Sequence, residues 1–155
     1  MPTFGAERAG ERGVIFWRDW TTSRESQMRL FLALIAATVG ISLSDWLFFG
    51  VIFHDEYMRT PEMWRPGPES RKIAASMLFA VFGTAAFLVL AQRTGVHAFG
   101  PAMALSVLVW LAAALPQTAT NTLYLKYSAK LGVSHALGWL ARLVIAAAAF
   151  VLIVG

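Results

Sequence analysis

Four long apolar stretches dominate the pattern of hydrophobic and polar positions along the chain. They run from about Leu30 to Phe53, from about Ile73 to Ala91, from Phe99 to Leu115 or onward to Tyr124, and from about His135 to Val154. A helix needs about 20 mostly apolar residues to cross a bilayer. The runs are continuous and rich in Ala and Leu, whereas the strands of a membrane barrel alternate. The pattern therefore predicts an all-α fold, in which residues 30–155 form an antiparallel four-helix transmembrane bundle.

A polar segment, residues 54–72, separates the first two stretches. Three prolines and a glycine exclude a long regular element from its middle. Its aromatic side chains provide apolar surface that can lie against the membrane or the bundle. We therefore expect an ordered lid that carries His54, Tyr57 and Trp64.

Residues 1–29 form a tail that mixes aromatic and charged side chains. Trp17 and Trp20 lie among charges, which is typical of an amphipathic segment at the membrane interface. Thr22 and Glu25 have the spacing of a capping box, so the first helix is expected to begin before it enters the hydrocarbon. At the last connection, Ser134 is the residue that we expect to cap the fourth helix.

Composition supports a membrane protein and excludes several other classes. Of the 155 residues, 57% are hydrophobic and 14% charged, whereas about a quarter are charged in soluble domains. The chain has no cysteine, so thiolate metal sites, disulfide scaffolds and thiol nucleophiles are excluded. The net charge is +4, but the basic residues are scattered over tail and loops, as in membrane-flanking segments. We therefore expect the lipid bilayer, and no nucleic acid, as a partner.

Two ionisable residues lie well inside the apolar stretches, where charge is costly and calls for an explanation. Asp45 precedes the end of the first stretch by eight residues, and Arg142 follows Ser134 by eight residues. A rise of 1.5 Å per residue puts each of them roughly 12 Å below the lid side. The alternation of four spans brings both to the same depth, so the sequence predicts an ion pair between the first and fourth helices. A pair that only fixes helix register is the simpler interpretation, and a catalytic or transport role is the alternative.

Further polar residues follow helical spacing toward the same end of the bundle. Gln117, Asn121 and Tyr124 follow Pro116, whose missing N–H frees a carbonyl near Ala112. The predicted ligand-binding or polar cluster consists of Ser42, Asp45, Gln117, Asn121, Tyr124, His135 and Arg142. The lid aromatics would close over this cluster. If the third helix ends at Leu115 instead, Gln117 and Asn121 lie in a loop.

Metal chemistry has only weak support in the sequence. His54, next to Asp55 and Glu56, and His135 are ligand types that metals accept. Their spacing matches no metal signature, and no nucleotide-binding or nucleophile motif is present. We therefore expect neither a metal nor a cofactor, and no catalytic residue can be assigned.

Several of these segments together resemble a known family. Ser44–Gly50 (SDWLFFG) is followed by a loop with Trp and Pro, then by Asn121–Tyr124 (NTLY), a short basic connection and Ser134–Trp139 (SHALGW). The arrangement resembles the small four-span bacterial membrane proteins catalogued as domain of unknown function 1761. The resemblance implies a multi-pass protein of the bacterial inner membrane, and it implies no activity. The basic residues divide evenly between the two sides; we expect a cytoplasmic amino terminus because the tail precedes the first inserted helix.

The sequence favours a protein that binds or moves a small solute or a proton through the polar cluster on the lid side. Two alternatives remain open. One is a structural or assembly subunit, as a homo-oligomer or within a larger membrane complex, because small residues such as Ala36, Gly40 and Ser44 allow close helix packing. The other is an integral-membrane enzyme that uses Asp45, His54 or His135 as acid or base.

Overall fold

The computed structural model of the protein describes residues 24–59, 61, 65–126 and 128–155. Within these ranges all regular structure is helical, so the all-α prediction is confirmed. The helices, in chain order, are α2 (Arg24–Leu47), η1 (Phe48–Ile52), α3 (His54–Met58), α4 (Glu69–Arg93), α5 (Phe99–Val109), η3 (Trp110–Ala114), α6 (Leu115–Tyr124) and α7 (Ala129–Ile153). The elements labelled η are π-helical turns. Trp17 and Trp20, expected as interfacial anchors, and Thr22, expected as a cap, lie outside the described residues.

Four of the described helical units are long and apolar enough to cross a membrane. They are Arg24–Ile52, Glu69–Arg93, Phe99–Tyr124 and Ala129–Ile153. Their outward surfaces carry large apolar side chains, such as Phe79 at 72% exposure and Leu43 at 63%. Water penalises apolar surface on this scale, whereas lipid accommodates it. The protein is therefore a multi-pass membrane protein.

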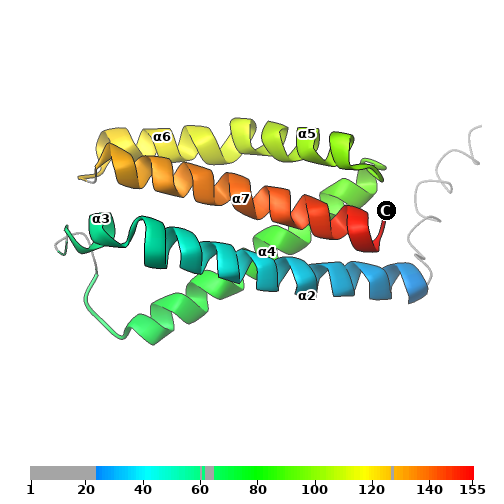
Figure 1. Ribbon diagram of the computed structural model, residues 1–155, viewed down its shortest axis with the longest axis horizontal. Coiled ribbons are helices and arrows are strands. Elements are labelled where there is room, and N and C mark those ends of the chain that lie inside the picture. The colour runs from blue at the N-terminus through cyan, green and yellow to red at the C-terminus, as the bar shows by residue number, and fades with distance from the viewer. Residues whose placement is uncertain (1–23, 60, 62–64, 127) are drawn as a thin grey trace, which may run out of the picture.

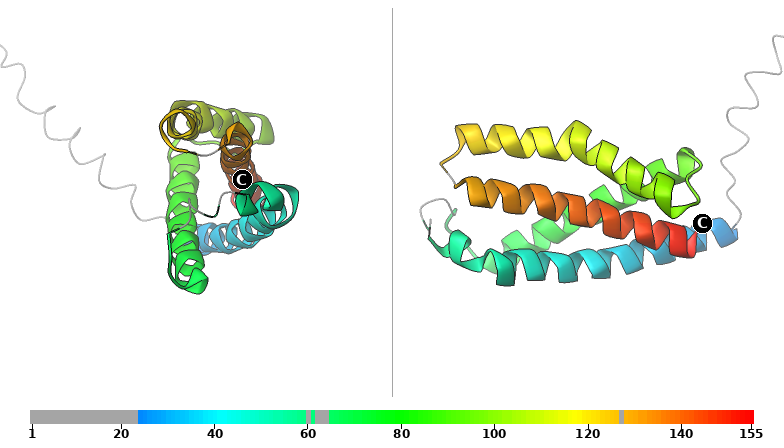
Figure 2. Two further views of the ribbon diagram at one scale, coloured as in Figure 1. Left: turned by 90° about the vertical axis from the view of Figure 1, so that its left-hand side faces the viewer. Right: turned by 45° about the horizontal axis from the view of Figure 1, so that its top comes forward.

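Three of the long helical units lie side by side, and α4 crosses them obliquely (Figure 1). The start of α2 and the C-terminus lie at one end, together with the turn between α4 and α5. At the other end, which we call the lid end, lie α3 and the connection from α6 to α7 (Figures 1 and 2). α7 packs against α2, α4, α5 and α6. The predicted antiparallel four-helix bundle is therefore not confirmed, because α4 is inclined to the other three units (Figure 1).

The third unit continues through Pro116 to Tyr124, so of the two possibilities left by the sequence the longer helix is correct. Trp110–Ala114 forms the π-helical turn η3 just before this proline. A π turn changes the hydrogen-bonding register by one residue, and such turns are one way in which a helix absorbs a local disruption. The Trp110 indole nitrogen donates to the Ala136 carbonyl at 2.8 Å, which fixes this turn on α7.

Two boundaries differ from the expectation. α7 begins at Ala129, and its cap is Ser128, whose hydroxyl accepts a hydrogen bond from the Leu131 amide. Ser134, the expected cap, instead lies inside α7 and is fully buried. The expectation placed the short connection as far as Val133, but a helix can begin several residues earlier, at the membrane interface. The segment 54–72 is also not entirely a loop, because it contains α3 and the first residues of α4.

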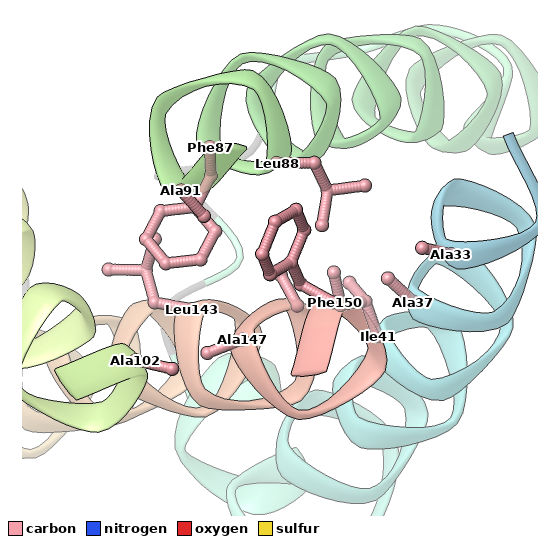
Figure 3. Close-up of a cluster of buried hydrophobic side chains, with 11 residues drawn as sticks. Ala33, Ala37, Ile41, Phe87, Leu88, Ala91, Ala102, Leu143, Ala147 and Phe150 are labelled. Atoms are coloured by element: carbon pink, nitrogen blue, oxygen red, sulfur yellow. The ribbon is translucent and has the colours of Figure 1, made fainter. Parts of the chain in front are cut away.

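Figure 3 shows the apolar core. Ala33, Ala37 and Ile41 repeat every fourth residue on α2 and pack, with side chains of α4 and α5, around Phe150 of α7. The core residues come from the first part of α2 and the last part of α7, so the core lies toward the end opposite the lid. Gly40 allows a close approach of α2 to α7, because a Cβ there would lie 2.9 Å from the Ile145 Cγ2. Small residues are what allow membrane helices to pack this closely. The core fixes α2 against α7 and thereby sets which side chains meet nearer the lid end.

The arrangement predicts that the two loops flanking α4 are on opposite sides of the membrane. Because the chain contains no cysteine, single substitutions Pro66→Cys and His97→Cys can be probed separately with a membrane-impermeant maleimide in sealed vesicles. We expect one thiol to react and the other to react only after the membrane is permeabilised. Leu108→Cys is the control: this side chain is 62% exposed on the protein surface, but lipid should keep the thiol unreactive. Equal labelling at Pro66 and His97 would refute four spans.

Candidate functional site

The ion pair predicted from the sequence forms between α2 and α7. The Arg142 Nε donates to one Asp45 carboxylate oxygen at 2.8 Å, and Nη2 donates to the other at 2.7 Å. The guanidinium also lies over the Trp139 ring, 5.2 Å from its centroid. Bidentate pairing and stacking on an aromatic face lower the cost of holding two charges away from water. Both side chains remain about a quarter exposed, 23% for Arg142 and 25% for Asp45.

The ion pair lines one of two cavities that α7 borders. The larger is an open groove of about 500 Å³ between the third helical unit and α7. Its lining residues are Val109, Ala113, Ala114, Gln117, Thr118, Asn121, Leu125, His135, Trp139 and Leu143. The smaller, of about 60 Å³, lies between α2, α4 and α7. Its lining residues are Thr38, Ile41, Ser42, Asp45, Ser76, Met77, Ala80, Thr84 and Arg142.

The predicted polar cluster is therefore divided between two sites. Gln117, Asn121 and His135 line the larger groove, whereas Ser42, Asp45 and Arg142 line the smaller cavity.

The seventh residue of the predicted cluster, Tyr124, is 83% exposed and lines neither cavity. α6 contacts α7 through Thr122, whose side chain is the nearest neighbour of Gly132. Tyr124 is two residues further along the helix and so projects on the opposite face.

The polar end of the groove presents amide and imidazole groups. The Gln117 Nε2 donates to the Asn121 Oδ1 at 3.1 Å, one turn further along α6. This leaves the Gln117 oxygen and the Asn121 nitrogen able to bond a bound molecule. His135 is half-buried and approaches from α7. The groove can therefore offer both donors and acceptors without any charged residue in its lining.

The lid reaches His135 rather than covering the whole cluster. The Tyr57 hydroxyl and the His135 Nε2 are 3.1 Å apart, within hydrogen-bond distance. The Phe49 ring packs on both, with ring centroids 5.6 Å from Tyr57 and 5.5 Å from His135. Gly138 makes room for this ring, since a Cβ there would lie 3.1 Å from the Phe49 Cζ. Of the other lid residues, His54 is exposed and lines neither cavity, and Trp64 lies outside the described residues.

Two further residues contribute that were not in the predicted cluster or lid set. Glu56 accepts a hydrogen bond from Lys130 at 3.2 Å and one from Ser128 at 3.5 Å, which ties α3 to the start of α7. Trp139 both lines the groove and supports Arg142. Its spacing from His135 and Arg142, four and three residues, places the three on one helical face and could have indicated its role. The described residues contain no group of three His, Cys, Asp or Glu side chains that could hold a metal ion.

Comparison with known protein families identifies the family of this chain. The model of the family described as "Protein of unknown function (DUF1761)" matches residues 32–151. The chain belongs to this family. The match confirms the resemblance noted in the sequence, and it covers the ion pair, both cavities and α3. No match was found among curated proteins or among solved structures.

The ion pair predicts a strongly non-additive mutant cycle. Asp45→Ala leaves the Arg142 guanidinium without its partner, which should lower the free energy of unfolding by about 3 kcal/mol. Asp45→Ala combined with Arg142→Ala should cost less than Asp45→Ala alone, because no charge is then left unpaired. The measurement is the unfolding temperature in detergent of Asp45→Ala, of Arg142→Ala and of the double variant.

The exposed pair between Glu25 and Arg29 is the control for this cycle. Its side chains are 68% and 49% exposed, and such pairs contribute less than about 1 kcal/mol. Glu25→Ala should therefore change the unfolding temperature little. Additive losses for Asp45→Ala and Arg142→Ala would contradict the coupling.

Proposed function

We propose that this integral membrane protein binds a small neutral organic molecule in the groove between α6 and α7. The observation that carries the proposal is the groove itself. Its volume of about 500 Å³ lies within the range of about 300–1,000 Å³ that is usual for small-molecule sites. Its wall is mostly apolar, with a few polar groups gathered on α6 and α7, which is also usual for such sites.

The lining indicates the chemistry of the molecule. Val109 and Leu143 offer apolar surface, and the Trp139 indole offers an aromatic wall. Gln117 and Asn121 offer amides, and His135 offers an imidazole. No Asp, Glu, Lys or Arg is among the lining residues. A neutral molecule with an apolar body and one hydrogen-bonding group matches this wall, because a charged one would lose its hydration without gaining a counter-charge.

The enzymatic alternative has less support. Its three acid–base candidates do not converge: Asp45 lines the smaller cavity and is held by Arg142, His135 lines the groove, and His54 lines neither. As expected from the sequence, we further propose that the protein lies in the bacterial inner membrane with its amino terminus in the cytoplasm. The groove supports binding only. It gives no argument for movement of a solute or a proton, or for assembly into an oligomer or larger complex.

Two neighbouring alanines allow a matched test. Ala113 lines the groove and Ala112 does not, although both are exposed. Ala113→Phe should fill the groove, whereas Ala112→Phe should only add a ring to the lipid-facing surface. Compounds that co-purify with the protein in detergent can be extracted with solvent and identified by mass spectrometry. We expect a compound enriched with the wild type and with Ala112→Phe, and reduced at least tenfold with Ala113→Phe.

Equal unfolding temperatures for the two variants would establish that Ala113→Phe leaves the fold intact. The proposal fails if no compound is enriched over a detergent and lipid blank, or if Ala113→Phe retains the compound. Either result would favour a structural or assembly role.

A further inference from the structure

The smaller cavity, between α2, α4 and α7, has a wall unlike that of the groove. Six of its lining residues are polar or charged: Thr38, Ser42, Asp45, Ser76, Thr84 and Arg142. The other lining residues are Ile41, Met77 and Ala80. The three helices that enclose it can be followed in Figure 2. This cavity is separate from the solute site proposed above.

The hydroxyls in this wall present oxygen lone pairs. The Ser42 Oγ donates to the Thr38 carbonyl at 2.9 Å, and the Thr84 Oγ1 donates to the Ala80 carbonyl at 2.8 Å. A hydroxyl has one hydrogen, so each of these oxygens can then only accept. The Asp45 carboxylate accepts two hydrogen bonds from Arg142 and has further lone pairs. These oxygens can therefore bond only to an occupant that donates hydrogen bonds.

The charge of the wall and the size of the cavity further limit which molecules can occupy it. The Asp45 carboxylate and the Arg142 guanidinium both face this cavity and neutralise each other, so neither a cation nor an anion gains a net opposite charge. A volume of about 60 Å³ is far below the 300 Å³ or so at which small-molecule sites begin. Water occupies about 30 Å³ in the liquid and needs two to four polar partners. A lipid chain would leave the wall unsatisfied.

We propose that the cavity between α2, α4 and α7 is a hydration site that holds about two water molecules against the Asp45–Arg142 pair. The waters donate to Ser42, Thr84 and Asp45, and they accept from guanidinium N–H groups that do not bond to Asp45. The Arg142–Trp139 stack separates these waters from the groove, because Arg142 lines the one cavity and Trp139 the other. The ion pair is thus solvated from the α4 side, although it lies in the membrane-spanning part of α2 and α7.

Met77 is a built-in reporter of this water. Radiolysis with a short X-ray pulse turns water into hydroxyl radicals, which oxidise the nearest reactive side chains, and methionine is among the most reactive. Met77 lines the cavity and is itself 49% exposed, so its oxidation in the wild type combines radicals from the cavity with radicals from outside, and the filled variants below separate the two. Met58, 67% exposed on α3, reports the radical dose from bulk water. The quantity measured by mass spectrometry on the purified protein is the oxidation rate of Met77 relative to that of Met58.

Filling the cavity is the test. Ala80→Leu places three further carbon atoms at a lining position, and Ala75→Leu, an exposed position on the same helix that lines neither cavity, is the matched control. We expect the relative oxidation rate of Met77 to fall at least threefold with Ala80→Leu and to stay unchanged with Ala75→Leu. Ser76→Leu, at an exposed lining position, provides a second filled variant in case Ala80→Leu does not fold.

An unchanged Met77 rate in a folded filled variant would show that its oxidation comes from bulk radicals, and it would overturn the hydration site. So would a Met77 that is not oxidised in the wild type. The co-purification result for the groove is independent of both outcomes.

Discussion

The ion pair between Asp45 and Arg142 is the constraint on which the rest of the structure depends. Neither residue can remain charged in the membrane without a partner, so α2 and α7 must lie next to each other at a set height and rotation. The close approach at Gly40 and the apolar core around Phe150 are consistent with that placement. Packing energy and charge pairing therefore favour the same helix register.

α7 contributes to both cavities. Arg142 lines the smaller cavity with residues of α2 and α4, whereas His135 and Trp139 line the groove with residues of the third helical unit. The charged pair borders a volume too small for an organic solute, and the neutral groove is large enough for one. Neither Asp45 nor Arg142 lines the groove, so a molecule bound there would not have to displace water from the charged pair.

The two ends of the molecule are held by different forces. Far from the lid, alanines pack closely with the rings of Phe87 and Phe150 (Figure 3). At the lid end, α3 is held by polar contacts, from Glu56 to the start of α7 and from Tyr57 to His135. Such contacts compete with water, whereas apolar packing in lipid does not. Each polar contact at the lid end therefore contributes less by itself than the Asp45–Arg142 pair, which is better shielded from water.

The sequence by itself determined the four helices and the shared depth of Asp45 and Arg142. Lipid leaves the backbone no alternative to a helix, and alternating spans bring the end of the first and the start of the fourth to one side. Only the tertiary structure decided how each helix is rotated and tilted. Helical spacing shows that Gln117, Asn121 and Tyr124 form one series, but not which neighbour that series meets. α6 turns Tyr124 outward, and Arg142 lines the smaller cavity rather than the groove that Trp139 lines, because packing between the helices, rather than local periodicity, sets the rotation of each helix.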